Sequence, residues 1–212
     1  MTAIKLLEKI KGQTRMNISI LGFCAAATAF FPRSASAHIV VTDTHGFLHG
    51  FSHPASGIDH ILAMIAVGLF AAHLGGRALW LVPLTFVSVM ALAGIAAAAG
   101  VTVPFVQVGI GMSVAALGLA IACRLNVPTS VAMSLVAFFA VFHGHAHGTE
   151  MPESISVLSY GFGFVFATAL LHAIGAGIGI AIANTSCHYS GWIVRISGAA
   201  MAIDGLVLLA SR

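Results

Sequence analysis

Charged residues are scarce in this chain of 212 residues, and their scarcity excludes most protein classes. Only 7% of the residues are Asp, Glu, Lys or Arg, whereas 59% are hydrophobic and the mean hydropathy is +1.03. A soluble domain of this length carries roughly a quarter charged residues. Only helices and closed barrels satisfy their backbone hydrogen bonds in lipid. The long apolar runs described below favour helices, so we expect an all-α integral membrane protein.

Cysteine is also rare. Cys24 lies near the amino end, and Cys123 and Cys187 are isolated from each other and from any other cysteine. Isolated cysteines form neither a disulfide framework nor a C-x-x-C metal clamp. The net charge of +3 comes largely from Lys and Arg within the first fifteen residues, so it gives no reason to expect a nucleic acid partner. We see no nucleotide-binding motif and no nucleophile motif.

The amino end has the pattern of a secretory signal peptide. A basic segment precedes an apolar run from Ile18 to Phe31, and Ala35-Ser36-Ala37 follows as an A-x-A cleavage signal. The apolar run is short for a membrane span of about 20 residues. We therefore expect a signal peptide over residues 1–37 and one transmembrane domain over residues 38–212. The alternative is an uncleaved first helix.

Six apolar runs follow, and each predicts a transmembrane helix. The fourth run is short for a span unless its helix continues through His147. Glycine is frequent in the third and fifth runs, where small residues let helices approach closely in lipid. The expected spans are Ile58–Leu74, Ala78–Ala99, Val103–Cys123, Thr129–Phe142, Ile155–Ala183 and Trp192–Leu209.

The distribution of arginine predicts the orientation of these spans. With the mature amino end outside, the loops after the first, third and fifth spans hold or adjoin Arg77, Arg124 and Arg195. The loops on the other side contain no Lys or Arg. The positive-inside rule therefore agrees with the signal peptide. We expect a multi-pass protein of the bacterial inner membrane with both mature termini on the periplasmic or extracellular side.

Histidine is concentrated in two stretches. The first, from His45 to His60, holds four histidines and Asp59 directly before the first span, and the second, from His143 to Glu150, holds three histidines at the end of the fourth. Imidazole is the commonest metal ligand among side chains. The predicted topology puts both stretches on the outer side, where they can form one metal site if the first and fourth spans are neighbours.

Helical spacing indicates which of these residues can share one face of a helix and bind one ion. His53 and His60 are seven residues apart, so on a continuous helix they point the same way. Asp59 is a ligand, a group that orients an imidazole, or only a capping carboxylate that pairs with Ser56. In the second stretch one helical face carries His143, His147 and Glu150, whereas His145 points elsewhere. The alternative for this stretch is an outer loop whose histidines are only solvated.

Both stretches resemble the motifs of a known family. His53-x5-Asp59-His60 and Phe142-His143-Gly144-x-Ala146-His147-Gly148-x-Glu150 match the paired motifs of the HupE/UreJ family of nickel or cobalt permeases. The resemblance covers the whole mature chain. It implies six spans after a signal peptide, and a link to hydrogenase or urease maturation. It also implies metal-handling roles for His53, Asp59, His60, His143, His147 and Glu150.

Other residues are candidates for the metal site or for a path through the membrane. Cleavage after Ala37 exposes His38 with a free α-amine, which can chelate a metal together with the imidazole, although a short disordered tail is the alternative. His172 is near mid-membrane, or it is a neutral imidazole bonded to a helix carbonyl, and Asp204 lies within the last span, or it pairs structurally. His73 lies at the inner end of the first span, and His188 follows Cys187. The further candidates are thus His38, His49, His145, His172 and Asp204.

We therefore expect a permease for Ni²⁺ or Co²⁺, not an enzyme, with no permanently bound cofactor. Metal enters at the outer ends of the first and fourth spans. Imidazoles and carboxylates without thiolate also suit Zn²⁺. The expected partners are a divalent metal ion, the lipid bilayer and a second copy in a homo-oligomer. The alternatives are an intramembrane zinc-dependent hydrolase and an accessory metal-binding subunit without transport.

Overall fold

The computed structural model describes residues 43–152, 154–185 and 190–211, and every regular element in these ranges is helical. The all-α class is therefore confirmed. The predicted signal peptide over residues 1–37 lies outside the described residues, as do His38, Cys187 and His188. The elements are α2 (Asp43–Ser52), the 3-10 helix η1 (His53–Ser56), α3 (Ile58–Leu74), α4 (Ala78–Ala98), α5 (Val106–Ala122), α6 (Thr129–Thr149), α7 (Val157–Ala183) and α8 (Ser190–Ala210).

A helix lies at each of the six predicted positions. By length and composition α4, α6, α7 and residues 191–210 of α8 can each cross a membrane. α3 and α5 have 17 residues each and are shorter. The segment from His45 to Ser56 and α3 together pass the same test, although they meet at a bend of 86°. The described helices are those of a multi-pass membrane protein.

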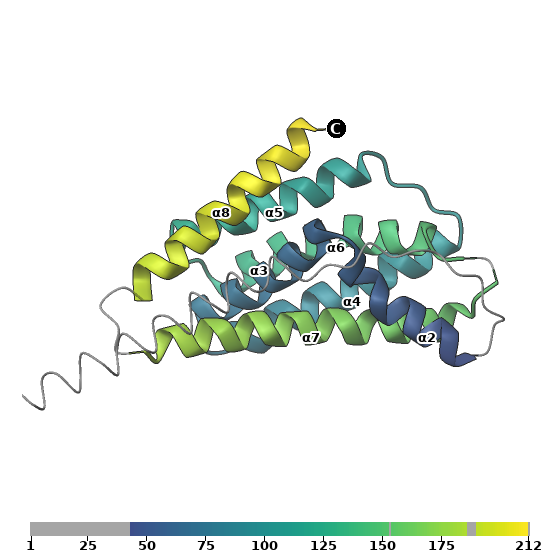
Figure 1. Cartoon of the computed structure of the whole chain (residues 1–212), viewed down its shortest axis with the longest axis horizontal. Coiled ribbons are helices and arrows are strands. Elements are labelled where there is room, and N and C mark those ends of the chain that lie inside the picture. Colours follow the sequence, from purple (N-terminus) through teal and green to yellow (C-terminus); the bar gives the residue numbers. More distant parts are fainter. Residues whose placement is uncertain (1–42, 153, 186–189, 212) are drawn as a thin grey trace, which may run out of the picture. The chain divides into compact units, whose positions relative to one another are not determined.

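Three features of the fold differ from the sequence-based prediction. α6 continues past Phe142 to Thr149, which makes it long enough to span. The continuous helix expected through His53 and His60 is wrong, because α2 ends at Ser52 and α3 begins only at Ile58. The helix α2 itself was not predicted. It lies against the first part of α7, and α3 lies against the later part (Figure 1).

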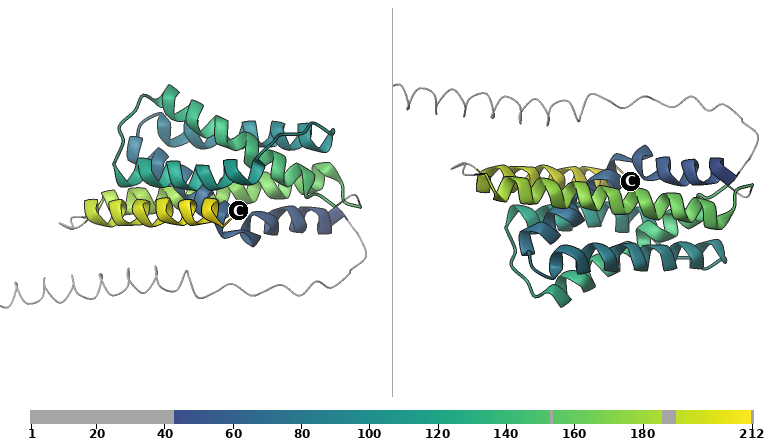
Figure 2. Two further views of the ribbon diagram at one scale, coloured as in Figure 1. Left: turned by 90° about the horizontal axis from the view of Figure 1, so that it is seen from above. Right: turned by 90° about the horizontal axis from the view of Figure 1, so that it is seen from below.

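Glycines set the closest helix pairs, because a side chain at these positions would collide with the neighbouring backbone. α6 approaches α4 through Gly144, which faces the carbonyl oxygen of Met90, and Gly148, which faces that of Gly94. α3 and α7 approach through Gly68 and Gly175 in the same way. α8 lies beside α5, where Gly118 meets Ala202 (Figure 2). These glycines serve packing, which the sequence predicted for Gly118 and Gly175 in the third and fifth runs.

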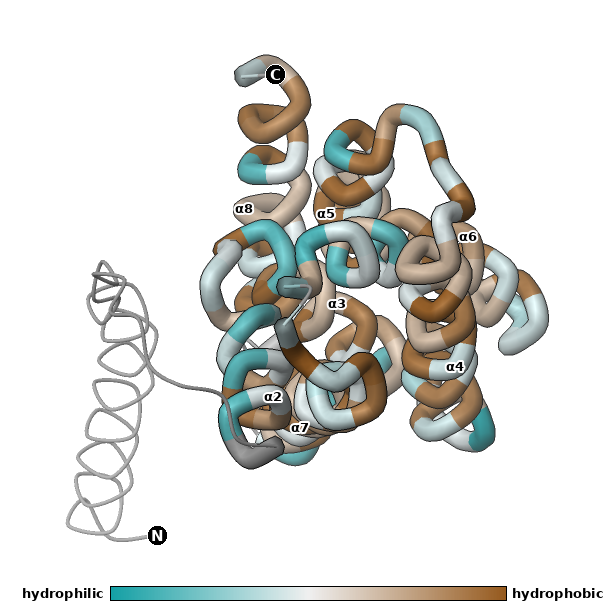
Figure 3. The backbone as a smooth tube through the Cα atoms, turned by 90° about the vertical axis from the view of Figure 1, so that its right-hand side faces the viewer, coloured by the Kyte–Doolittle hydropathy of each residue, from teal (hydrophilic) through white to brown (hydrophobic). Residues whose placement is uncertain are grey.

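The centre of the bundle is apolar. The fully buried side chains include Met64, Phe70, Val82 and Leu117, which come from three different helices. Many other large apolar side chains are exposed, such as Trp80 and Phe162. In Figure 3, where the backbone is coloured by hydropathy, brown hydrophobic stretches are found on all of the labelled helices. Apolar side chains on both the inner and outer faces are what a bundle in lipid requires, because lipid replaces water around it.

Candidate metal site

The break between α2 and α3 has a local cause. Pro54 has no backbone N–H, so α2 cannot continue through it. Ser52 Oγ donates to the carbonyl oxygen of His49 at 3.2 Å, and Ser56 Oγ donates to that of His53 at 2.6 Å, which satisfies carbonyls left open at the break. Gly57 is extended, with φ −116° and ψ 125°. The chain therefore turns sharply between His53 and His60.

The second stretch forms the last turns of α6. His143 and His147 are buried, with exposed fractions of 0% and 2%. The contacts of Gly144 and Gly148 hold this end of α6 against α4. Glu150 caps the helix, and its N–H donates to the carbonyl oxygen of Ala146 at 3.0 Å. The alternative of a solvated outer loop is therefore wrong for His143 and His147.

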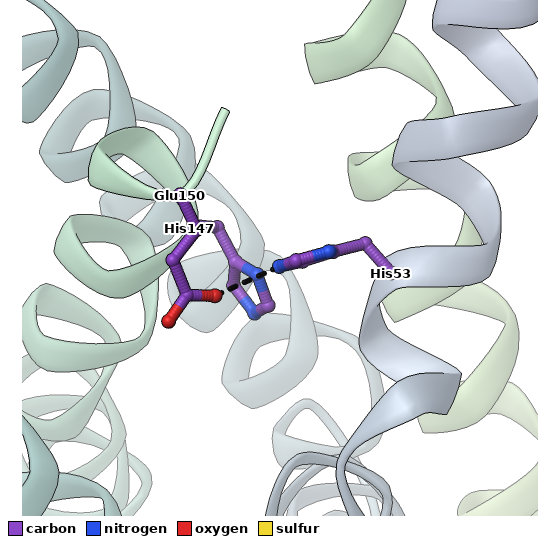
Figure 4. Close-up of side chains that lie close together, drawn as sticks. All are labelled: His53, His147 and Glu150. Atoms are coloured by element: carbon purple, nitrogen blue, oxygen red, sulfur yellow. Dashed lines mark hydrogen bonds and ion pairs between the residues drawn. The ribbon is translucent and has the colours of Figure 1, made fainter. Parts of the chain in front are cut away.

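The two stretches meet in an outer cluster of His53, His147 and Glu150. His53 Nε2 lies 2.9 Å from Glu150 Oε2, and the rings of His53 and His147 are 4.8 Å apart (Figure 4). One nitrogen or carboxylate oxygen of each residue lies within 4.8 Å of the others. Donors around a tetrahedral ion with bonds of about 2.0–2.1 Å lie roughly 3.3 Å apart. Small side-chain movements would therefore bring all three onto one ion.

Asp59 orients His60 at the inner edge of this cluster. Its Oδ1 accepts the backbone N–H of His60 and lies 2.9 Å from His60 Nδ1. Because a carboxylate can only accept, Nδ1 carries the proton and Nε2 keeps its lone pair. Nε2 is buried with no hydrogen-bond partner among the described residues, and the ring lies 4.6 Å from that of His147. This is how proteins orient metal-binding imidazoles.

The alternative of a capping box for Asp59 is wrong in its pairing. Ser56 Oγ donates to the carbonyl oxygen of His53, and the residue that caps the start of α3 is Gly57, with no side-chain hydrogen bond of its own. Asp59 nevertheless accepts a backbone N–H in the first turn, so it stabilises the helix start while it holds the imidazole. Gly57 makes room for both tasks, because a Cβ there would lie 2.6 Å from Asp59 Oδ1 and 3.0 Å from His60 Nδ1.

Ser113 orients His143, a role that the sequence analysis missed. Its Oγ donates to the carbonyl oxygen of Ile110 at 2.6 Å and lies 2.9 Å from His143 Nε2. The hydroxyl has one proton, so Nε2 must donate to Oγ and Nδ1 keeps its lone pair. Nδ1 is buried without a partner among the described residues, and the His143 and His60 rings lie 5.1 Å apart. Ser113 is the single hydroxyl of α5, which could have drawn attention to it.

Helix ends add an electrostatic component. The carboxyl end of a helix carries about half a negative charge. α2 ends at Ser52, next to His53, and α6 ends at Thr149, next to Glu150, so two such ends lie beside the outer cluster. The amino end of α3 has the opposite sign, and Asp59 in its first turn offsets it. The site therefore favours a cation.

Aromatic rings form the remaining wall. The Phe164 ring lies 4.0 Å from that of His147, and the Tyr160 ring lies 5.8 Å from that of His53. A crevice of about 220 Å³ between α4, α6 and α7 reaches His147 and is almost wholly apolar. Tyr160 and Phe164 were not predicted, because aromatic residues in an apolar run are usually core. The most exposed member of the outer cluster is Glu150, whose side chain is 47% exposed.

The other predicted candidates lie at different distances from this site. His49 is exposed on α2, with its ring 6.2 Å from that of His53. His145 points away, as predicted: its Nε2 lies 3.0 Å from the N–H nitrogen of Val103 and from the carbonyl oxygen of Val101 in the α4–α5 loop. His172 is buried deeper, on α7. Asp204 lies on α8, and its Oδ2 is buried without a hydrogen-bond partner among the described residues.

Buried imidazoles beside carboxylates at the break of a membrane helix are typical of an ion-handling membrane protein, because such groups are costly in lipid without an ion or a partner. The profile of the family described as HupE / UreJ protein matches residues 25–208, and the chain belongs to that family. The family consists of metal transporters and not of enzymes. Both the resemblance and the expectation that the protein is not an enzyme are therefore confirmed.

A curated relative supports the same assignment. Protein HupE from Rhizobium leguminosarum bv. viciae is 42% identical over 184 residues, which cover 86% of this chain and 94% of the relative. No solved structure matches the chain.

Proposed function

We propose that this protein is a permease that carries Ni²⁺ or Co²⁺ across the inner membrane into the cytoplasm, for use in hydrogenase or urease maturation. The ion first binds the outer cluster of His53, His147 and Glu150, and then meets His60 and His143. The observation that carries the proposal is the convergence of both motifs on these side chains. It agrees with the membership of a family of metal transporters.

The chemistry of the donors supports a borderline divalent cation. The outer cluster and its inner neighbours offer imidazole nitrogens and one carboxylate, and no thiolate lies among them. Such donors suit nickel, cobalt and zinc. Nickel or cobalt is the proposal because of the family, while zinc fits the same donors. An imidazole and carboxylate site also releases its ion more readily than a cage of four thiolates.

The arrangement of the helices supports the proposed orientation. α3 and α7 run in the same direction, since Ile65 packs on Gly175 and Ala72 on Gly179. α4 and α6 also run together, as Met90 packs on Gly144 and Gly94 on Gly148. Both pairs fit six spans that alternate in direction. Six spans with the histidine end outside therefore remain our proposal.

Arginine lies at the opposite end of the bundle from the outer cluster. A pocket of about 220 Å³ is lined by His73 at the end of α3, Arg124 after α5, Ala183 at the end of α7 and Gly191 in α8. These four helix ends belong to the proposed cytoplasmic side, which agrees with the positive-inside rule.

The membrane potential can drive inward movement. It supplies about 2.3 kcal/mol per unit charge per 100 mV, and roughly twice that for a divalent cation. No nucleotide-binding motif is present in the sequence. Passive uptake down the potential is therefore sufficient, and we propose no further energy source.

Purified protein in liposomes loaded with a metal-sensitive dye tests the proposal. With a negative interior potential, added Ni²⁺ or Co²⁺ should raise the internal signal, and removal of the potential should slow it. Binding of metal without a rise in the internal signal would contradict a permease and leave an accessory metal-binding subunit. Liposomes without protein and liposomes with His147→Ala serve as controls.

A further inference from the structure

His172 lies further from the outer cluster than His143 does, and the ring of Phe86 separates the two imidazoles. The Phe86 ring lies 5.5 Å from that of His143 and 5.1 Å from that of His172, which it meets edge to face. Phe86, His143 and His172 come from α4, α6 and α7. All three are buried, and Phe86 is 0% exposed.

His172 has no structural use that accounts for its burial. Neither ring nitrogen has a hydrogen-bond partner among the described residues, so the alternative of a bond to a helix carbonyl is wrong. The same is true of Thr168 Oγ1, which is 0% exposed and lies one turn earlier on the same face of α7. Buried polar groups are nearly always satisfied, so unsatisfied ones call for an explanation.

Toward the arginine end the bundle is closed by apolar side chains. On α3 the residues after Gly68 include Phe70, on α4 the residues before Phe86 include Val82, and on α6 the residues before His143 include Val136. Phe70, Val82 and Val136 are all buried. An ion that passed Phe86 would therefore find its next donors at Thr168 and His172. Among the described residues of α3, the next imidazole toward the arginine end is that of His73.

We propose that His172 and Thr168 form a second, transient binding site for the transported divalent cation, and that the Phe86 ring is the gate between it and the outer cluster. The inference rests on the function proposed above. One imidazole and one hydroxyl bind a divalent ion weakly, which suits a stop that must release its ion. When the Phe86 ring turns aside, the ion moves from His143 to His172.

A thiolate at position 172 reports directly whether the ion arrives. In a chain whose Cys24, Cys123 and Cys187 are replaced by serine, His172→Cys is purified in detergent and mixed with Co²⁺. We expect near-ultraviolet charge-transfer absorption from a cobalt–thiolate bond. Ala173→Cys is the matched control, because Ala173 is the next residue on α7 and is exposed on its outer face. That variant should bind Co²⁺ without the charge-transfer band.

The gate has its own readout in the same chain. Combining Phe86→Ala with His172→Cys should speed the appearance of the band by about tenfold, and Phe86→Trp should slow it. Ligand-field absorption reports Co²⁺ bound at the outer cluster. If that absorption is present but His172→Cys gives no thiolate band, the second site is overturned. No Co²⁺ bound at all by the parent would instead overturn the proposed function. If the band forms at the same rate with Phe86, with Phe86→Ala and with Phe86→Trp, the gate is overturned.

A second variant covers the case in which His172→Cys does not fold. His172→Leu suits the apolar surroundings and should fold at least as well as the parent. We expect it to bind Co²⁺ at the outer cluster with unchanged affinity while liposome uptake falls by about tenfold, the lower range for loss of a group at a metal site. Uptake equal to that of the parent would overturn the role of His172.

Discussion

His53 Nε2 and Glu150 Oε2 lie 2.9 Å apart, although 97 positions separate the two residues in the chain. The pair joins the break after α2 to the end of α6, and each residue stands beside a helix carboxyl end. Without a metal, the hydrogen between these two atoms occupies the place that a cation would take. Metal binding and proton release are therefore coupled at the outer cluster.

The first prediction is a pH dependence. Because a metal ion and a proton compete for the same nitrogen and carboxylate lone pairs, metal affinity should rise as the pH rises and fall as the pH falls. Isothermal titration in two buffers of different ionisation enthalpy measures the released protons. Glu150→Gln should weaken Ni²⁺ binding by about tenfold or more. His145→Ala is the matched control on the same helix and should leave affinity unchanged, and equal losses in both variants would contradict the site.

Asp59→Asn gives the second prediction. The amide keeps the shape and one acceptor oxygen but no longer carries the charge that holds the proton on His60 Nδ1. We expect Ni²⁺ affinity to fall by about 10- to 100-fold, as for other groups that orient a metal-binding imidazole. The thermal unfolding temperature should change little. A large drop in that temperature with unchanged affinity would make Asp59 only a helix-start residue.

The third prediction concerns Ser113, which was found only from the structure. Ser113→Ala removes the acceptor for His143 Nε2–H, so the ring can rotate or change tautomer. Metal affinity should fall by about tenfold. Ser134→Ala is the control, since Ser134 is exposed on α6 and bonds only to the carbonyl oxygen of Ser130. Comparable affinity in the two serine variants would show that Ser113 does not position His143.

Gly144→Ala provides the fourth prediction. The added Cβ would meet the Met90 carbonyl oxygen and lie 2.9 Å from Ala93 Cβ, so α6 must move away from α4. Overpacking of this kind costs about 1–3 kcal/mol. Gly161→Ala is the control on α7, because a Cβ there meets nothing within 4 Å. Thermal unfolding in detergent should show a marked loss for Gly144→Ala and no loss for Gly161→Ala. The reverse order would contradict the packing described for α6.

The sequence predicted which histidines come together and where the long helices lie, but not the bend in the backbone that brings the histidines together. Hydropathy located the helix at Ile58–Leu74 to the residue, because a long apolar run in lipid has one stable conformation. It did not reveal α2, since the stretch before Ser52 mixes histidine and glycine with apolar residues and has no clear period. His53 and His60 do converge on His147, but across a bend rather than along one helix. Convergence across a bend depends on contacts between distant helices, which spacing alone does not contain.

The roles of Ser113 and Phe86 also depend on contacts between distant helices, which the sequence pattern does not contain. Phe86 is one apolar residue in an apolar run, and nothing in the local pattern distinguishes it from core. Ser113 is the single hydroxyl of α5, but the sequence does not indicate which side chain it contacts. Their roles come from the neighbours that α6 and α7 bring to them. By contrast, His145 was separated from His143 and His147 correctly, because the helical period alone fixes which residues share a face.

The nickel X-ray absorption spectrum of the metal-bound protein tests the central claim most directly. If the two stretches hold the ion together, the spectrum of the parent should contain the multiple scattering of imidazole rings. That scattering should weaken in His60→Ala, from the first stretch, and in His147→Ala, from the second. A spectrum with oxygen ligands alone, or one that neither substitution changes, would contradict a shared site built from both stretches.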